Sequence, residues 1–179
     1  MAAGATYVPL ASTTLSSDTG SVTFSSISSS YTDLVIIMSV QGNTGGTAQG
    51  SNTNFLRFNG DTASNYGATR MYGATSSSSV QYGMFSNATS MHIGNGYESL
   101  TANTTFTPHI INIFNYANTA VNKSVIARAN TTYSSDIRAA INIGAWRSTS
   151  AVTSVTIYTD STGGYRTGST FALYGIAAA

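Results

Sequence analysis

Charge and cysteine are the two things that this sequence lacks. Only 7% of its 179 residues are Asp, Glu, Lys or Arg, the formal net charge is +1, and there is no cysteine. The absence of cysteine excludes disulfides, thiol catalysis, zinc–thiolate sites and iron–sulfur clusters. The basic residues are scattered with no two adjacent, so a basic patch for nucleic acid or for an anionic membrane surface is missing too. We therefore expect neither nucleic acid nor a membrane as a partner.

Long apolar segments are also missing. The longest aliphatic run, residues 34–38, is far too short to span a bilayer. Residues 1–9 contain neither a basic segment nor a continuous apolar one, so we expect no secretory signal there.

What the sequence does contain is a hydroxyl-rich background interrupted by short apolar runs. The hydrophobic share is 41% and tyrosine occurs 11 times, which is too much for a disordered chain. The runs alternate with a period of two, and turn signals separate them. The segments that predict strands are residues 20–27, 31–41, 54–59, 68–74, 80–85, 106–116, 123–129, 137–146, 152–159 and 171–176. We predict an all-β, single-domain antiparallel β-sandwich, jelly-roll-like, of about ten strands, with a loop beginning at residues 92–96.

The first fifteen residues differ from the rest, because small polar residues dominate and Pro9 opposes a helix. We predict an extended N-terminal arm over residues 1–15 and the sandwich domain over residues 16–179. Within the arm, the candidates for packing or for contact with a neighbouring chain are Tyr7, Val8, Pro9 and Leu10. An extended segment can pair with a sheet edge, and few charges protect the edges here. A homo-oligomer is expected, with a trimer as the expected order.

A polar cluster surrounds the turn dipeptide at residues 59–60 and consists of Arg57, Asn59, Asp61 and Asn65. Asx side chains satisfy backbone groups in turns, and an Arg beside an Asp can anchor a loop through charge-assisted bonds. A structural role is the preferred interpretation. Calcium binding at Asp61 is the alternative, although one carboxylate falls short of the usual ligand set.

No pattern of residues predicts catalysis. The acids lie mostly at turns or strand ends and never as a close pair; a glycosidase pair from distant strands is the alternative left open. His92 and His109 lack a second ligand at metal spacing, and we interpret His109 as a hydrogen-bonded structural residue. We expect no enzyme, no cofactor and no metal. Trp146 and the pair Ile141 and Ile143 are on opposite faces of the same predicted strand. This favours packing or a subunit interface for Trp146, with sugar binding as the alternative.

Three parts of the sequence carry a family likeness. They are residues 22–27 (VTFSSI) with 31–35 (YTDLV), residues 56–61 (LRFNGD) with 65–66, and residues 146–149 (WRST) with 151–155 (AVTSV) and 168–176 (GSTFALYGI). In matching order over most of the chain, they resemble a widespread group of tailed-bacteriophage virion proteins common among cyanophages and environmental phages. Members often carry Pro just after the position of Ile27, where this chain has Ser28.

The resemblance implies a surface component of the virion and identifies no catalytic residue. We expect a capsid decoration (cement) protein on the outer surface of the head, with the major capsid protein and other virion proteins as partners. A hydroxyl-rich exterior without an export signal fits this, because a virion component is made in host cytoplasm and released by lysis. The alternative is a tail-associated or receptor-binding module that recognises host surface glycan.

Overall fold

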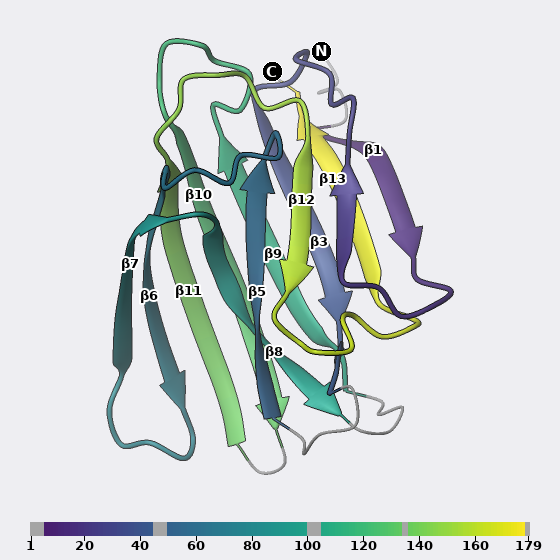
Figure 1. The fold of residues 1–179 in the computed structure, drawn as a ribbon, viewed down its shortest axis with the longest axis vertical. Coiled ribbons are helices and arrows are strands. Elements are labelled where there is room, and N and C mark those ends of the chain that lie inside the picture. The colour runs from purple at the N-terminus through teal and green to yellow at the C-terminus, as the bar shows by residue number, and fades with distance from the viewer. Residues whose placement is uncertain (1–5, 45–49, 100–104, 134–135, 178–179) are drawn as a thin grey trace.

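The computed structural model describes residues 6–44, 50–99, 105–133 and 136–177. Two β-sheets pack face to face, so the predicted all-β sandwich is confirmed (Figure 1). Within the described ranges, no helix is long and apolar enough to cross a membrane.

The described residues form thirteen strands, three more than the sequence predicted. They are β1 (Tyr7–Thr14), β2 (Ser21–Phe24), β3 (Asp33–Val40), β4 (Gly42–Asn43), β5 (Gly50–Phe58), β6 (Tyr66–Ala74), β7 (Gln81–Ala88), β8 (Met91–Ser99), β9 (Thr107–Phe114), β10 (Lys123–Tyr133), β11 (Asp136–Trp146), β12 (Val155–Thr159) and β13 (Thr170–Ile176). The three additional strands are β1, β4 and β8.

One sheet has eight strands in the order β1-β13-β3-β9-β10-β11-β6-β7, and the other has five in the order β2-β12-β5-β8-β4. All pairs are antiparallel except the two-residue pair of β4 with β8. In Figure 1 the five-stranded sheet lies in front of the eight-stranded one, with β7 and β1 at opposite edges of the latter. β8 packs against β10, β11 and β6, so it joins the two layers in the middle of the sandwich.

The core lies between the sheets because side chains alternate along each strand. From the eight-stranded sheet, Ile36, Ile111 and Val125 point inward and are at most 1% exposed. Leu56 and Ile157 meet them from the five-stranded sheet and are fully buried. Burial of this apolar surface stabilises the fold, and the chain has no cysteine with which to form a disulfide.

Residues 7–14 lie within the sandwich and not in an arm outside it. β1 pairs with β13, beginning with Tyr7 opposite Ile176. Pro9 is accommodated because an edge strand has one open side, where a missing N–H breaks no ladder hydrogen bond. The register shifts just after Pro9, which marks a bulge. Residues 1–5 of the expected arm lie outside the described residues.

Residues 92–96 belong to β8, where the sequence predicted a loop. Gly94 has a φ of 133° and lies where the register between β5 and β8 shifts. A Cβ at this position would be 3.0 Å from the Cβ of Ala129 and 3.2 Å from the ring of His109 on the facing sheet. In the sequence Gly94 is typical of a loop, but in the structure its missing side chain allows β8 to approach the eight-stranded sheet closely.

Candidate functional site

Asp61 is the centre of the polar cluster at the turn after β5. One carboxylate oxygen accepts the backbone N–H of Ala63 at 2.8 Å. The other accepts the side-chain amide of Asn65 at 2.9 Å and the indole N–H of Trp146 at 2.6 Å. The hydrogen bonds from Asn65 and Trp146 lower the pKa of Asp61. Because Trp146 ends a strand of the other sheet, the contact links the two layers.

Asn59 ties the same turn to the segment before β12. Its φ of 51° is in the left-handed region, which Asn tolerates. The side-chain oxygen accepts the N–H groups of Thr153 at 2.8 Å and Ser154 at 3.1 Å, and the amide donates to the carbonyl of Ala151 at 2.8 Å. Each polar atom of this side chain satisfies a loop backbone group.

Arg57 does not join this cluster, so the expected pair with Asp61 is not formed. Alternation along β5 places Arg57 on the outer face of the five-stranded sheet. Its Nε donates to the carbonyl of Thr89 at 3.0 Å, and its guanidinium lies 4.6 Å from the ring centre of Tyr158. The structure thus brings together three of the four residues, and adds Trp146, which the sequence did not place there.

The surroundings of Asp61 argue against the calcium alternative. Both oxygens face N–H hydrogens, which carry positive partial charge and would repel a cation. Over the described ranges, no three His, Asp or Glu side chains gather in a way that could hold a metal ion. The hydrogen bonds of this cluster hold the turn after β5 in place and connect it to the end of β11, which is a structural role.

The two histidines lie in a polar layer between the sheets. His109 is fully buried; its Nδ1 donates to the carbonyl of Thr107 at 3.2 Å and its Nε2 accepts the amide of Asn54 at 3.2 Å. His92 donates from Nδ1 to the side-chain oxygen of Asn142 at 3.0 Å. These partners assign the tautomers. Burial lowers the pKa of each histidine to about 4, so both are neutral near pH 7.

The acids whose side chains are described each accept a backbone N–H. Besides Asp61, the donors are Thr167 for Asp18, Asn115 for Asp33 and Thr53 for Asp160. Such contacts anchor the chain, and the hydrogen bond from Thr167 is the main reason why the pKa of Asp18 is lowered.

The four candidate residues near the N-terminus divide between the two sides of β1. Val8 and Leu10 are half-buried, and Leu10 packs against the core. Tyr7 is exposed and meets the ring of Tyr174 edge to face, with centroids 6.3 Å apart. Pro9 is exposed at the sheet edge. Half of this set therefore packs within the chain, and the other half faces outward.

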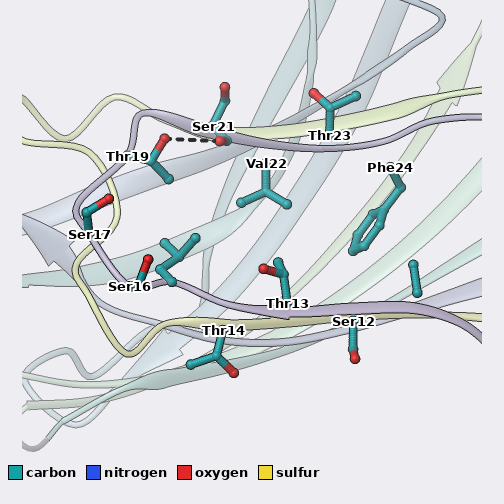
Figure 2. Close-up of a pocket in the computed structure, with 12 residues that line it drawn as sticks. Ser12, Thr13, Thr14, Ser16, Ser17, Thr19, Ser21, Val22, Thr23 and Phe24 are labelled. Atoms are coloured by element: carbon teal, nitrogen blue, oxygen red, sulfur yellow. Dashed lines mark hydrogen bonds between the residues drawn. The ribbon is translucent and has the colours of Figure 1, made fainter.

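A groove of about 500 Å³ runs between β1 and β2, where one edge of each sheet faces the other (Figure 2). Val22 and Phe24 point into it. Its other lining is mostly hydroxyl-bearing and uncharged: Ser12, Thr13, Thr14, Ser16, Ser17, Thr19, Ser21 and Thr23. Figure 2 shows that Ser12, Thr14, Ser21 and Thr23 point away from the space between the two strands, so only some of these hydroxyls face it. Phe24 is buried and offers no open ring for stacking.

A larger surface is the outer face of the eight-stranded sheet. On β11, Ile137 and Ile143 are 54% and 53% exposed, whereas the polar Asn142 points inward and is buried. The alternation along this strand agrees with the sequence, but the apolar side faces outward, the reverse of the usual arrangement. The one signal in the sequence is that residues 34–38 carry apolar side chains on both faces of their strand, although only one face can point into the core.

The outward side chains of six adjacent strands align in two neighbouring rows. From β7 to β3, one row contains Tyr82, Met71, Ile141, Arg128, Ile110 and Ile37. The next row contains Met84, Thr69, Ile143, Ile126, Asn112 and Val35. We call the following residues the apolar face: Ile37, Met71, Tyr82, Met84, Ile110, Ile126, Ile141 and Ile143.

The apolar face is exposed and nearly uncharged. Tyr82 and Met84 are 79% and 77% exposed. The one charge within the two rows is Arg128, whose Nη2 donates to the side-chain oxygen of Asn112 at 3.3 Å. With strands about 4.8 Å apart and about 3.3 Å of rise per residue, two rows across six strands, each row about two residues deep, span roughly 400 Å². The largest apolar patch on a typical monomeric protein is about this size and is often functional.

No protein-family model, curated protein or solved structure matches the chain. The function therefore has to be inferred from the contacts and exposure of the described side chains. The polar cluster and the buried histidines hold the sandwich together, and the apolar face is free to contact a partner.

Proposed function

We propose that the chain is a structural protein of a tailed-bacteriophage virion, a capsid decoration (cement) protein that binds the outside of the head and stabilises the shell. Its partners are the major capsid protein, other virion proteins and further copies of the chain. It acts by contact and not by catalysis. The likeness described for residues 22–35, 56–66 and 146–176 supports the virion assignment.

The observation that carries the contact function is the apolar face. A shell-binding protein needs a broad, stiff surface, and a sheet hydrogen-bonded across eight strands supplies one. Apolar contact is non-directional and approximately proportional to the area removed from water, so it suits attachment to a large surface. The hydrogen bond from Trp146 to Asp61 ties the five-stranded sheet to the back of the eight-stranded one.

The second candidate function is a tail-associated or receptor-binding module for host glycan. One observation favours it: on the outer face of the five-stranded sheet, Phe55 and Tyr158 stack with centroids 5.2 Å apart, beside the guanidinium of Arg57. Sugars bind partly open aromatic rings next to polar donors. Both rings are half-buried, so this platform is smaller than the apolar face.

Quantification of the chain against the major capsid protein in purified particles separates the two functions. A decoration protein is present in numbers comparable to the shell subunit, whereas a tail module is present in a few copies. Binding of the purified chain to host cells or lipopolysaccharide, lost in Tyr158→Ala, is the result expected of the glycan module.

The role of the apolar face is tested with particles from which the chain has been removed. The double variant Met71→Lys with Ile143→Lys places two charges on exposed positions of the apolar face, so it should fold normally and fail to attach. The matched control, Ser21→Lys with Ser25→Lys, adds the same charge to exposed positions near β2 and should attach like the wild type. Attachment of both variants would contradict the proposal.

A further inference from the structure

Four strands form the edges of the two sheets, and three of them are protected. β4 has two residues and β2 has four, too short to offer a long ladder. β1 carries Pro9 and a bulge. Natural sheets use these same devices to prevent pairing with other chains. The fourth edge, β7, has none of them between Gln81 and Phe85.

β7 has eight residues, QYGMFSNA, with no charge and no proline. It pairs regularly with β6 from Gln81 to Phe85, and it is the last strand of its sheet in Figure 1, with no described strand on its other side. Its register shifts only near Asn87, which has a φ of 51°. The backbone groups on the open side of residues 81–85 are therefore in position for another strand.

We propose that β7 pairs with β7 of a second copy of this chain, antiparallel about a two-fold axis at Gly83. In this register Tyr82 faces the partner's Met84 and Gln81 faces the partner's Phe85. Tyr82 and Met84 both point outward, one in each row of the outer face, so an aromatic ring meets a thioether on each side of the axis. The strand is self-complementary, which a two-fold interface requires.

Charge also favours a second copy as the occupant. Like charges opposite each other would oppose such pairing, and this edge has none. Arg147 lies beyond residues 81–85 and donates to the side-chain oxygen of Asn87 at 2.7 Å. The guanidinium of Arg70 is held on the inner side by Asn95 at 2.9 Å and lies 5.9 Å from the ring of Phe85. It does not reach out across the edge.

The pairing would make the two apolar faces continuous across the axis, since Tyr82 and Met84 are the outermost members of each. It yields a dimer, where the sequence suggested a trimer. An edge contact of this extent is at the small end of specific interfaces, so we expect a dissociation constant on the order of micromolar. The dimer forms in solution whether or not the chain binds a capsid, so its failure and that of the proposed function are separate results.

The first test is the molar mass of the full chain by light scattering or sedimentation at about 1 to 100 µM, a range that brackets the expected constant. The wild type should pass from monomer to dimer. In Tyr82→Lys with Met84→Lys, each lysine faces a lysine of the partner, which should weaken the dimer by roughly tenfold or more. The control, Ile137→Lys with Ile143→Lys, adds equal charge two strands from the edge and should keep the dimer.

The second test uses the absence of cysteine from the chain. A mixture of the single variants Tyr82→Cys and Met84→Cys should form a disulfide-linked pair on mild oxidation, because these positions are opposite each other across the axis. Either variant alone should crosslink weakly, since identical positions lie two residues out of register. Both positions are largely exposed, so the substitutions should not affect folding.

A wild type that stays monomeric, a trimer, or a dimer that the lysines at residues 82 and 84 leave unchanged would each overturn the inference. Preferential crosslinking of either cysteine variant with itself would overturn the register.

Discussion

The indole N–H of Trp146 donates to a carboxylate oxygen of Asp61 at 2.6 Å, joining the end of β11 to the turn after β5 in the other sheet. Trp146 is 3% exposed and stacks on Tyr66, with ring centroids 6.3 Å apart. A buried indole N–H has no water to replace a lost acceptor. The Asp61 carboxylate is therefore a structural element of the sandwich.

We predict that Asp61→Ala lowers the free energy of unfolding by about 2–3 kcal/mol, because it leaves the indole N–H unsatisfied. Chemical denaturation near pH 7 measures this. Asp33→Ala, which removes one exposed N–H acceptor, is the control and should cost about 1 kcal/mol or less. The pKa of Asp61 is lowered from 3.8, so its contribution is present above that pH and is lost as the pH falls through the folded value. Equal costs for the two variants would contradict this role.

The buried histidines predict how stability depends on pH. The pKa of His92 and of His109 is about 4 in the folded protein and 6.5 in the unfolded chain. Between these values the unfolded chain binds more protons, so stability should fall as the pH is lowered from 6.5 towards 4. The loss is on the order of 3 kcal/mol for each histidine. In His109→Gln the slope over this range should be about halved, and an unchanged slope would show that His109 does not cause it.

Much of the fold follows from the sequence because alternation and turn residues are local signals. Ten strands and the sandwich class were predicted on this basis. β1 was missed because its apolar residues are few and it carries a proline that only an edge tolerates. β8 was missed because Gly94 fits the approach of two sheets, and that approach is a property of the tertiary structure.

The sites were less predictable for the same reason. The turn role of Asn59 and Asp61 follows from their residue types, whereas the position of Arg57 depends on the face of β5 to which it belongs. The direction of Ile143 was not readable from β11 alone. Asn142 points inward because its side-chain oxygen accepts a hydrogen bond from His92 of the facing sheet, and the apolar residues of β11 therefore point outward.

Gly94 and Gly73 provide a matched comparison. At Gly94 the φ of 133° is strained for any other residue, and a Cβ would lie 3.0 Å from that of Ala129. We predict that Gly94→Ala lowers the free energy of unfolding by about 2–4 kcal/mol through strain and overpacking. Gly73→Ala meets nothing within 4 Å and should be neutral or slightly stabilising. Thermal unfolding of both variants provides the measurement, and a tolerated Gly94→Ala would mean that β8 lies further from the facing sheet.

Lys123 is a buried cation whose partners are all backbone groups. It is fully buried, and its Nζ donates to the carbonyls of Asn118 at 2.6 Å, Val121 at 2.7 Å and Thr149 at 3.1 Å. Lys123→Met keeps the stem but leaves three carbonyls without this donor, so we predict a loss of about 3 kcal/mol in denaturant unfolding. Arg128→Met removes a cation with one long hydrogen bond on the apolar face and should change stability by less than about 0.5 kcal/mol. If Lys123→Met were equally mild, the segments at residues 118–121 and 149 would have to be held by other contacts.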